Sequence, residues 1–219
     1  RVAIDGFVPT ACAGNSHSAA ITGEGSLWVW GENAEGQLGL ADKEDRAVPT
    51  AVTGSFEKAT MIAAGFGVTI AIDVDGFVRK SGRLRYDGPE STTFTRVQFP
   101  DTPGRPVGVS CAGVHAVVWT AEGRLFTWGR GIHGQLGHGS NERSDVPRQV
   151  QALETVPIAS AAAGEHAPLA LDRNGNLWSW GSGRALGHAG DTESQQLLPK
   201  VIEGLPQGAT IRRIAAYGA

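Results

Sequence analysis

The sequence predicts an all-β fold built from repeated small sheets. Three observations lead to this prediction: a high glycine content, one phrase that returns four times, and a hairpin turn at the same place in each copy. The chain has 219 residues, of which 31 are glycine, about twice the usual share of ~7%. Because each glycine inside a helix costs about 1 kcal/mol relative to alanine, this composition disfavours long helices and favours short strands joined by tight turns.

The repeat is about 50 residues long. Copies of the phrase begin at Ala13, Ala64, Ala112 and Ala163, and the first glycines of successive copies are 51, 48 and 51 residues apart. Such a period is typical of folds in which each copy is one small structural unit. We therefore expect one partial domain over residues 1–219, with units at 1–50, 51–96, 97–149 and 150–201 and the start of a fifth at 202–219.

Each unit contains the signature of a β-hairpin followed by an aromatic strand. An apolar run is followed by a polar turn with glycine, and these turns predict hairpins. A second run then ends, in three units, in a tryptophan with a glycine directly after it. Two or three short strands per period, rich in glycine and aromatic residues, are typical of a propeller blade. The amphipathic spacing of helix-pair repeats is missing from the sequence.

The motifs AG-x-x-H, L-W-x-W-G, G-x-x-G-Q-L-G and V-P recur in fixed order and resemble the regulator of chromosome condensation repeat. The resemblance implies a β-propeller of seven four-stranded blades, of which this chain holds about four and a half. It also implies that the other blades come from a longer chain or another subunit. Family members act as exchange factors for small GTPases, ciliary or ubiquitin-ligase scaffolds, an ultraviolet-B photoreceptor and a bacterial inhibitor of β-lactamase, so the resemblance predicts the fold far better than the function.

The second unit departs from the repeat. Arg79 stands where the other units have Trp28, Phe126 and Trp178, and Ser81 stands where they have tryptophan. Two aromatic side chains of ~150–250 Å² each are therefore missing. We expect this blade either to be loosely packed or to be completed by another molecule. We also expect Arg79 to reach solvent or to meet a carboxylate, because an unpaired buried guanidinium is costly.

Patterns for catalysis, cofactors and metals were weighed and set aside. The G-x-G-x-x-G run at residues 129–134 has no helix-forming sequence after it, which a dinucleotide site requires. His17, His115 and His166 fall in different units, whereas the ligands of a zinc ion converge on one point. We expect loop histidines to be solvated; these are His133, His138 and His188. The sequence thus predicts a protein without enzymatic activity, cofactor or metal.

Charge points to a protein partner. The net charge of −3 and the pI of about 6.1 do not favour direct nucleic-acid binding. Loops at equivalent places in the units carry an acidic group beside a basic one, a pattern that can steer a protein partner. The predicted partner-binding residues are Glu32, Glu35 and Asp42 in the first unit, Arg79, Lys80, Arg83 and Arg85 in the second, and Arg130, His133 and Arg143 in the third.

The compartment and the function follow from the remaining observations. Cys12 and Cys111 lie at equivalent places two units apart, so we expect two unlinked thiols in an intracellular protein, cytoplasmic or nuclear, with cytoskeletal or ciliary assembly as a further setting. The sequence contains no run long and apolar enough for a membrane span. The favoured function is a non-catalytic interaction or scaffold module that binds proteins such as a small GTPase or a large assembly. Nucleotide exchange on a small GTPase is the alternative, and light sensing by crowded tryptophans is a third.

Overall fold

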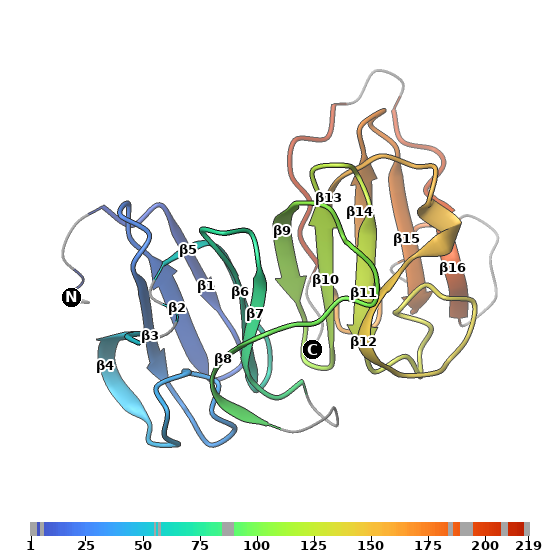
Figure 1. Cartoon of the computed structure of the whole chain (residues 1–219). Coiled ribbons are helices and arrows are strands. Elements are labelled where there is room, and N and C mark those ends of the chain that lie inside the picture. The colour runs from blue at the N-terminus through green and yellow to red at the C-terminus, as the bar shows by residue number, and fades with distance from the viewer. Residues whose placement is uncertain are drawn as a thin grey trace. The chain divides into compact units, whose positions relative to one another are not determined.

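The computed structural model describes residues 4, 7–54, 56, 58–84, 90–183, 186–188, 195–206 and 210–216. In these residues the chain forms four antiparallel sheets of four strands each (Figure 1). Blade 1 contains β1 (Thr10–Ala13), β2 (His17–Ile21), β3 (Leu27–Gly31) and β4 (Arg46–Ala51), and blade 2 contains β5 (Ala59–Ala64), β6 (Val68–Asp73), β7 (Val78–Gly82) and β8 (Ser91–Arg96). Blade 3 contains β9 (Pro106–Cys111), β10 (His115–Thr120), β11 (Leu125–Gly129) and β12 (Ser144–Gln149), and blade 4 contains β13 (Ile158–Ala162), β14 (Leu169–Asp172), β15 (Leu177–Ser182) and β16 (Gln195–Val201).

Strand order within every blade follows the chain, so each blade is a meander with its last strand at one edge. A short 3₁₀ turn, η1 (Gln151–Leu153), leads from blade 3 to blade 4. The predicted all-β fold of propeller blades is confirmed. By its contacts the chain divides into two compact units: unit 1 holds residues 1–98 and 109–114, and unit 2 holds residues 99–108 and 115–219.

The glycine after each third-strand aromatic creates a β-bulge. In all four blades the register between the third and fourth strands shifts just before this glycine. Gly31 has φ 108° and Gly129 has φ 106°, a backbone conformation that costs glycine little and other residues more. A Cβ on Gly31 would also lie 2.5 Å from the carbonyl oxygen of Ser16. The glycine at this place is therefore a requirement of the blade, and blade 2 keeps it as Gly82 although a serine precedes it.

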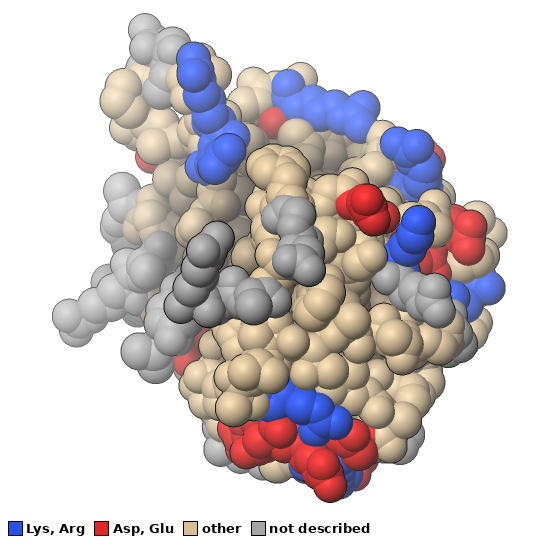
Figure 2. Space-filling view, turned by 90° about the vertical axis from the view of Figure 1, so that its left-hand side faces the viewer, with Lys and Arg blue, Asp and Glu red and all other residues tan. Residues whose placement is uncertain are grey.

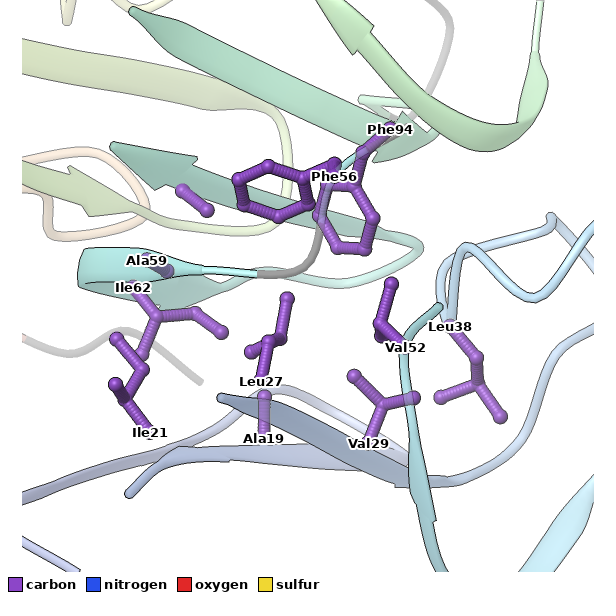
Figure 3. Packing of buried hydrophobic residues seen from close by; sticks show 11 residues of the cluster. Ala19, Ile21, Leu27, Val29, Leu38, Val52, Phe56, Ala59, Ile62 and Phe94 are labelled. Carbon is purple, nitrogen blue, oxygen red and sulfur yellow. The ribbon is translucent and has the colours of Figure 1, made fainter. Parts of the chain in front are cut away.

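The core of unit 1 lies between its two blades (Figure 3). Ile21, Leu27 and Val29 project from blade 1, and Phe56 and Phe94 meet them from the side of blade 2; all five are at most 5% exposed. Alternate residues of β3 point into this core, as the two-residue period of a strand requires. Burial of this apolar surface stabilises the unit by about 25 cal/mol per Å² removed from water.

Both cysteines are free thiols, as predicted. Burial raises the pKa of the Cys12 thiol to about 12, and burial also raises the pKa of the Cys111 thiol. Both groups are therefore protonated and unreactive at neutral pH, because the thiolate is the nucleophile. No helix in the described part of the chain has the length and apolar character that crossing a membrane requires.

Candidate functional site

Arg79, the most unusual residue of blade 2, is held by a carboxylate of its own blade. Its Nε donates a hydrogen bond to Oδ2 of Asp73 at 2.6 Å. The other carboxylate oxygen of Asp73 accepts the backbone N–H groups of Asp75 and Phe77 at 3.0 and 2.8 Å. The Asp73 side chain is 4% exposed and that of Arg79 is 20% exposed. The expectation that Arg79 meets a carboxylate is confirmed. The charge of Arg79 is balanced by Asp73 of its own blade.

The same arrangement recurs in blade 4 with a tryptophan in place of the arginine. Asp172 accepts the backbone N–H groups of Asn174 and Asn176, each at 2.9 Å, and its Oδ2 accepts the indole N–H of Trp178 at 3.1 Å. These hydrogen bonds hold the pKa of the Asp172 carboxyl below its usual range, although its burial acts in the opposite direction. Arg79 therefore supplies the same hydrogen bond that Trp178 supplies at the equivalent position.

Ser81 likewise keeps a hydrogen bond that tryptophan makes elsewhere. Its hydroxyl donates to the carbonyl oxygen of Gly36 in the preceding blade at 2.7 Å. In blade 4 the indole N–H of Trp180 donates to the carbonyl oxygen of Gln135, also in the preceding blade, at 2.9 Å. In both pairs this hydrogen bond joins the third strand of one blade to a loop of the preceding blade.

Two phenylalanines fill the space that the missing aromatic residues leave. The rings of Phe56 and Phe94 pack at a centroid distance of 4.8 Å, and the guanidinium of Arg79 lies 5.4 Å from the centroid of Phe56. Ser81 is fully buried and Phe94 is 4% exposed. The prediction that blade 2 is loosely packed or completed by another molecule is therefore wrong, because its own side chains complete the packing.

The loop between β3 and β4, residues 32–46, is held in one shape by a buried asparagine; we call it the acidic loop. The side-chain oxygen of Asn33 accepts the N–H of Leu38, and its amide group donates to Asp42. The backbone N–H of Asn33 donates a hydrogen bond to the carboxylate of Asp45 at 2.8 Å. Because Asn33 is fully buried and its bonds join both halves of the loop, the loop is ordered without a partner.

Ion pairs join the acidic loop to the neighbouring blade. Arg83 Nη2 lies 2.8 Å from Glu35 Oε2, and Lys43 pairs with Glu90. Lys43 also holds the pKa of the Glu90 carboxyl below its usual range. Because these groups are partly exposed, both pairs stabilise the blade contact only weakly. Some residues of the predicted acidic and basic sectors therefore pair with each other where the two blades of unit 1 meet.

Other carboxylates of the acidic loop remain open to solvent. Glu32, Glu44 and Asp45 are exposed, and Figure 2 shows acidic side chains gathered at the lower edge, where this loop lies in Figure 1. Asp42 pairs with Arg46 at 2.6 Å. The backbone N–H of Glu44, followed by the Arg46 side chain, holds the pKa of the Asp42 carboxyl below its usual range. This edge is the candidate functional site of unit 1.

The remaining predicted basic residues are placed differently. Lys80 is half-buried in β7, and Arg85 lies outside the described residues. In unit 2, Arg130 is half-buried after β11. Arg143 is exposed and pairs with Asp145, its Nε donating to Oδ1 at 2.8 Å. The structure therefore gathers the acidic residues of the prediction on one loop and distributes the basic ones.

The loop histidines are half-buried and have partners within the protein, so the expectation that they are solvated holds only in part. The ring of His133 packs against that of His166 with a centroid distance of 4.2 Å. Nε2 of His138 lies 3.1 Å from the Thr127 hydroxyl, and His188 makes the equivalent contact in blade 4. Within the described ranges, histidine, cysteine and carboxylate side chains form no group of three or more that could hold a metal ion.

Sequence reasoning missed Asn33, Asp73 and Glu90, which fix the candidate site and its surroundings. For Asp73 a signal existed, because Arg79 follows it by six residues and Trp178 follows Asp172 by the same distance. Glu90 gave no such signal, since its partner Lys43 comes from a loop of another repeat.

These blades, with loops that bond to the next blade, define a β-propeller protein. The model of the regulator of chromosome condensation (RCC1) repeat matches residues 24–72 and 122–171, and the chain belongs to this family. It is 35% identical over 178 residues to the ultraviolet-B receptor UVR8 of Arabidopsis thaliana, covering 78% of this chain and 40% of the receptor. It is 32% identical over 210 residues to the E3 ubiquitin-protein ligase HERC2 of Homo sapiens, covering 90% of this chain and 4% of the ligase.

Solved structures agree with this fold. The crystal structure of human WBSCR16 matches all of this chain and 57% of its own with a TM-score of 0.82 and 23% identity. That of Prp20p from Saccharomyces cerevisiae covers 93% of this chain and 52% of its own, with a TM-score of 0.78 and 20% identity. The chain thus spans 40% of the length of UVR8 and slightly more than half of these two structures.

Proposed function

We propose that the chain is a non-catalytic protein-interaction module and that the acidic loop binds a basic surface of its partner. The observation that carries this proposal is the loop's order: Asn33 holds its shape, while Glu32 and Glu44 are exposed. A loop that is already ordered loses little conformational freedom on binding. Exposed charges of one sign steer association with a partner of the opposite sign.

The experiment compares two double variants of equal charge change. Glu32→Gln with Glu44→Gln removes two exposed carboxylates of the acidic loop. Glu24→Gln with Asp75→Asn removes two from the hairpin turns of blades 1 and 2, which are also exposed. Each immobilised protein is used to capture partners from its native source at about 50 and 300 mM salt, and the bound proteins are quantified by mass spectrometry.

We expect the acidic-loop variant to lose bound proteins that the wild type and the turn variant retain. The difference should be larger at low salt, because exposed charges are screened as the ionic strength rises. Equal capture by all three proteins at both salt concentrations would contradict the assignment of the loop.

Nucleotide exchange is tested separately, since exchange factors occur in the same family. Of the proteins compared above, Prp20p is described as binding Gsp1p and histones. Purified small GTPases loaded with a fluorescent nucleotide are mixed with the chain, and nucleotide release is followed with time. A module that only binds leaves the release rate unchanged, whereas an exchange factor raises it.

A further inference from the structure

A buried histidine in unit 2 lacks the hydrogen bond that its counterpart in unit 1 makes. His17 in β2 and His115 in β10 occupy the same repeat position, since each lies opposite the bulge glycine of the next strand. Nε2 of His17 lies 2.8 Å from the hydroxyl of Thr69. That hydroxyl donates its hydrogen to the carbonyl of Gln37 at 2.7 Å. The imidazole must therefore donate to the hydroxyl oxygen, so Nε2 carries a proton.

In blade 4 a proline stands where blade 2 has this threonine. Thr69 pairs with Ser81, and the register of β14 and β15 places Pro168 opposite Trp180, the equivalent residue. Proline has no side-chain group that could bond to an imidazole. His115 is fully buried, and both of its ring nitrogens lack a hydrogen-bond partner in the described part of the chain.

Two further histidines of unit 2 form a ring pair, and one of them, His166, acts electrostatically on His115. His166, in the loop between β13 and β14, packs against His133, in the loop between β11 and β12. Nδ1 of His166 is also buried without a partner among the described residues. The neighbouring charged groups are Arg130 and Glu165, both acting on His133. In the described part of the chain, His115 and Nδ1 of His166 thus lack hydrogen bonds that would stabilise an added proton, and the two residues come from adjacent blades.

This environment favours the neutral rings. Burial and the neighbouring His166 lower the pKa of His115 to about 3. Burial, followed by His166 and Arg130, lowers the pKa of His133, and Glu165 opposes this effect. A ring that is released into water regains its ordinary pKa of about 6.5. Acid therefore stabilises any state of the protein in which the cluster is open.

We propose that His115, together with the paired rings of His133 and His166, forms an acid-sensitive latch between blades 3 and 4, which is closed at neutral pH and opens on proton uptake by His115 and His133. Opening releases the loops that carry His133 and His166, while blade 1 is unaffected by this cluster. The balance is simple: each proton comes from solvent and is taken up by a ring nitrogen that has no partner in the closed form. For His115 alone, the opening constant rises about thirtyfold between pH 7.5 and 5.0.

The test is hydrogen exchange measured by mass spectrometry at pH 7.5 and 5.0, corrected for the intrinsic pH dependence of exchange. Wild-type peptides over residues 131–136 and 163–168 should lose protection about thirtyfold at pH 5.0. The double variant His115→Leu with His166→Phe should change less than threefold. The control His17→Gln replaces a buried histidine of unit 1 that lies outside the cluster, and it should leave the exchange of these two peptides like that of the wild type.

A second measurement keeps the proposal testable if the double variant does not fold. The ring signals of the wild-type histidines are followed by NMR over the same pH range. Proton uptake by His115 and His133 should coincide with the loss of amide protection. Retained protection at pH 5.0 in the wild type, or an equal loss in the double variant, would overturn the latch.

Discussion

The pair formed by Asp73 and Arg79 offers the sharpest test of how blade 2 is held together. Replacing Arg79 by phenylalanine leaves a carboxylate that is 4% exposed with only its two backbone N–H partners. Removing one member of a buried ion pair costs about 3–5 kcal/mol. Because the two backbone bonds remain, we expect a loss of about 2–4 kcal/mol in the free energy of unfolding of unit 1.

The chain itself supplies the matching rescue. In blade 3 the turn residue equivalent to Asp73 is Thr120, whose hydroxyl accepts the N–H of Arg124 at 3.2 Å, and the residue equivalent to Arg79 is Phe126. Asp73→Thr combined with Arg79→Phe therefore rebuilds the blade 3 combination. With no buried carboxylate left, this double variant should be more stable than Arg79→Phe alone by about 1.5 kcal/mol or more.

Urea unfolding read by labelling of the Cys12 thiol measures this effect in unit 1. Cys12 lies in β1 of blade 1 and has a raised thiol pKa, so it reacts when that unit unfolds; Cys111, in β9 of blade 3, is replaced by alanine in all variants. With a slope of about 1–3 kcal/mol per molar urea, Arg79→Phe should lower the midpoint by about 1–2 M. A change below about 0.5 kcal/mol, or a double variant no more stable than the single one, would refute the assigned role of Asp73.

Two further predictions concern unit 1. Burial lowers the pKa of His17 to about 4, so the unfolded chain takes up a proton at a higher pH than the folded one. The free energy of unfolding therefore falls as the pH drops from about 6.5 to 4, by up to about 1.4 kcal/mol per pH unit. His17→Gln, which keeps a donor for Thr69, should reduce this slope in urea titrations at successive pH values. Gly39→Ala should cost about 2–4 kcal/mol in thermal unfolding, because φ is +69° and the new Cβ would overlap the ring of Phe94. Gly54→Ala, with φ +104° but open space around the new Cβ, should cost only about 1 kcal/mol.

The fold was predictable because its signals are local. The turn glycines, the aromatic strands and the 50-residue period each lie within one stretch of chain, and they set hairpins and blades whatever the rest does. The packing of blade 2 was not predictable in this way. Phe56 and Phe94 lie 38 residues apart in the sequence. Their contact depends on how the segment before β5 packs against β8. Ion pairs such as Arg83 with Glu35 depend on the stacking of two blades.

At two repeat positions the hydrogen bond is kept although the residue type changes. Arg79 and Trp178 both donate to a turn aspartate, and Ser81 and Trp180 both donate to a loop carbonyl of the preceding blade. A departure from the repeat is therefore weak evidence for a binding site, because the departing residue can do the same structural work. Charges that make no such bond are better evidence. By this criterion the exposed carboxylates of Glu32 and Glu44, and not the arginine of blade 2, are where a partner of unit 1 should be sought.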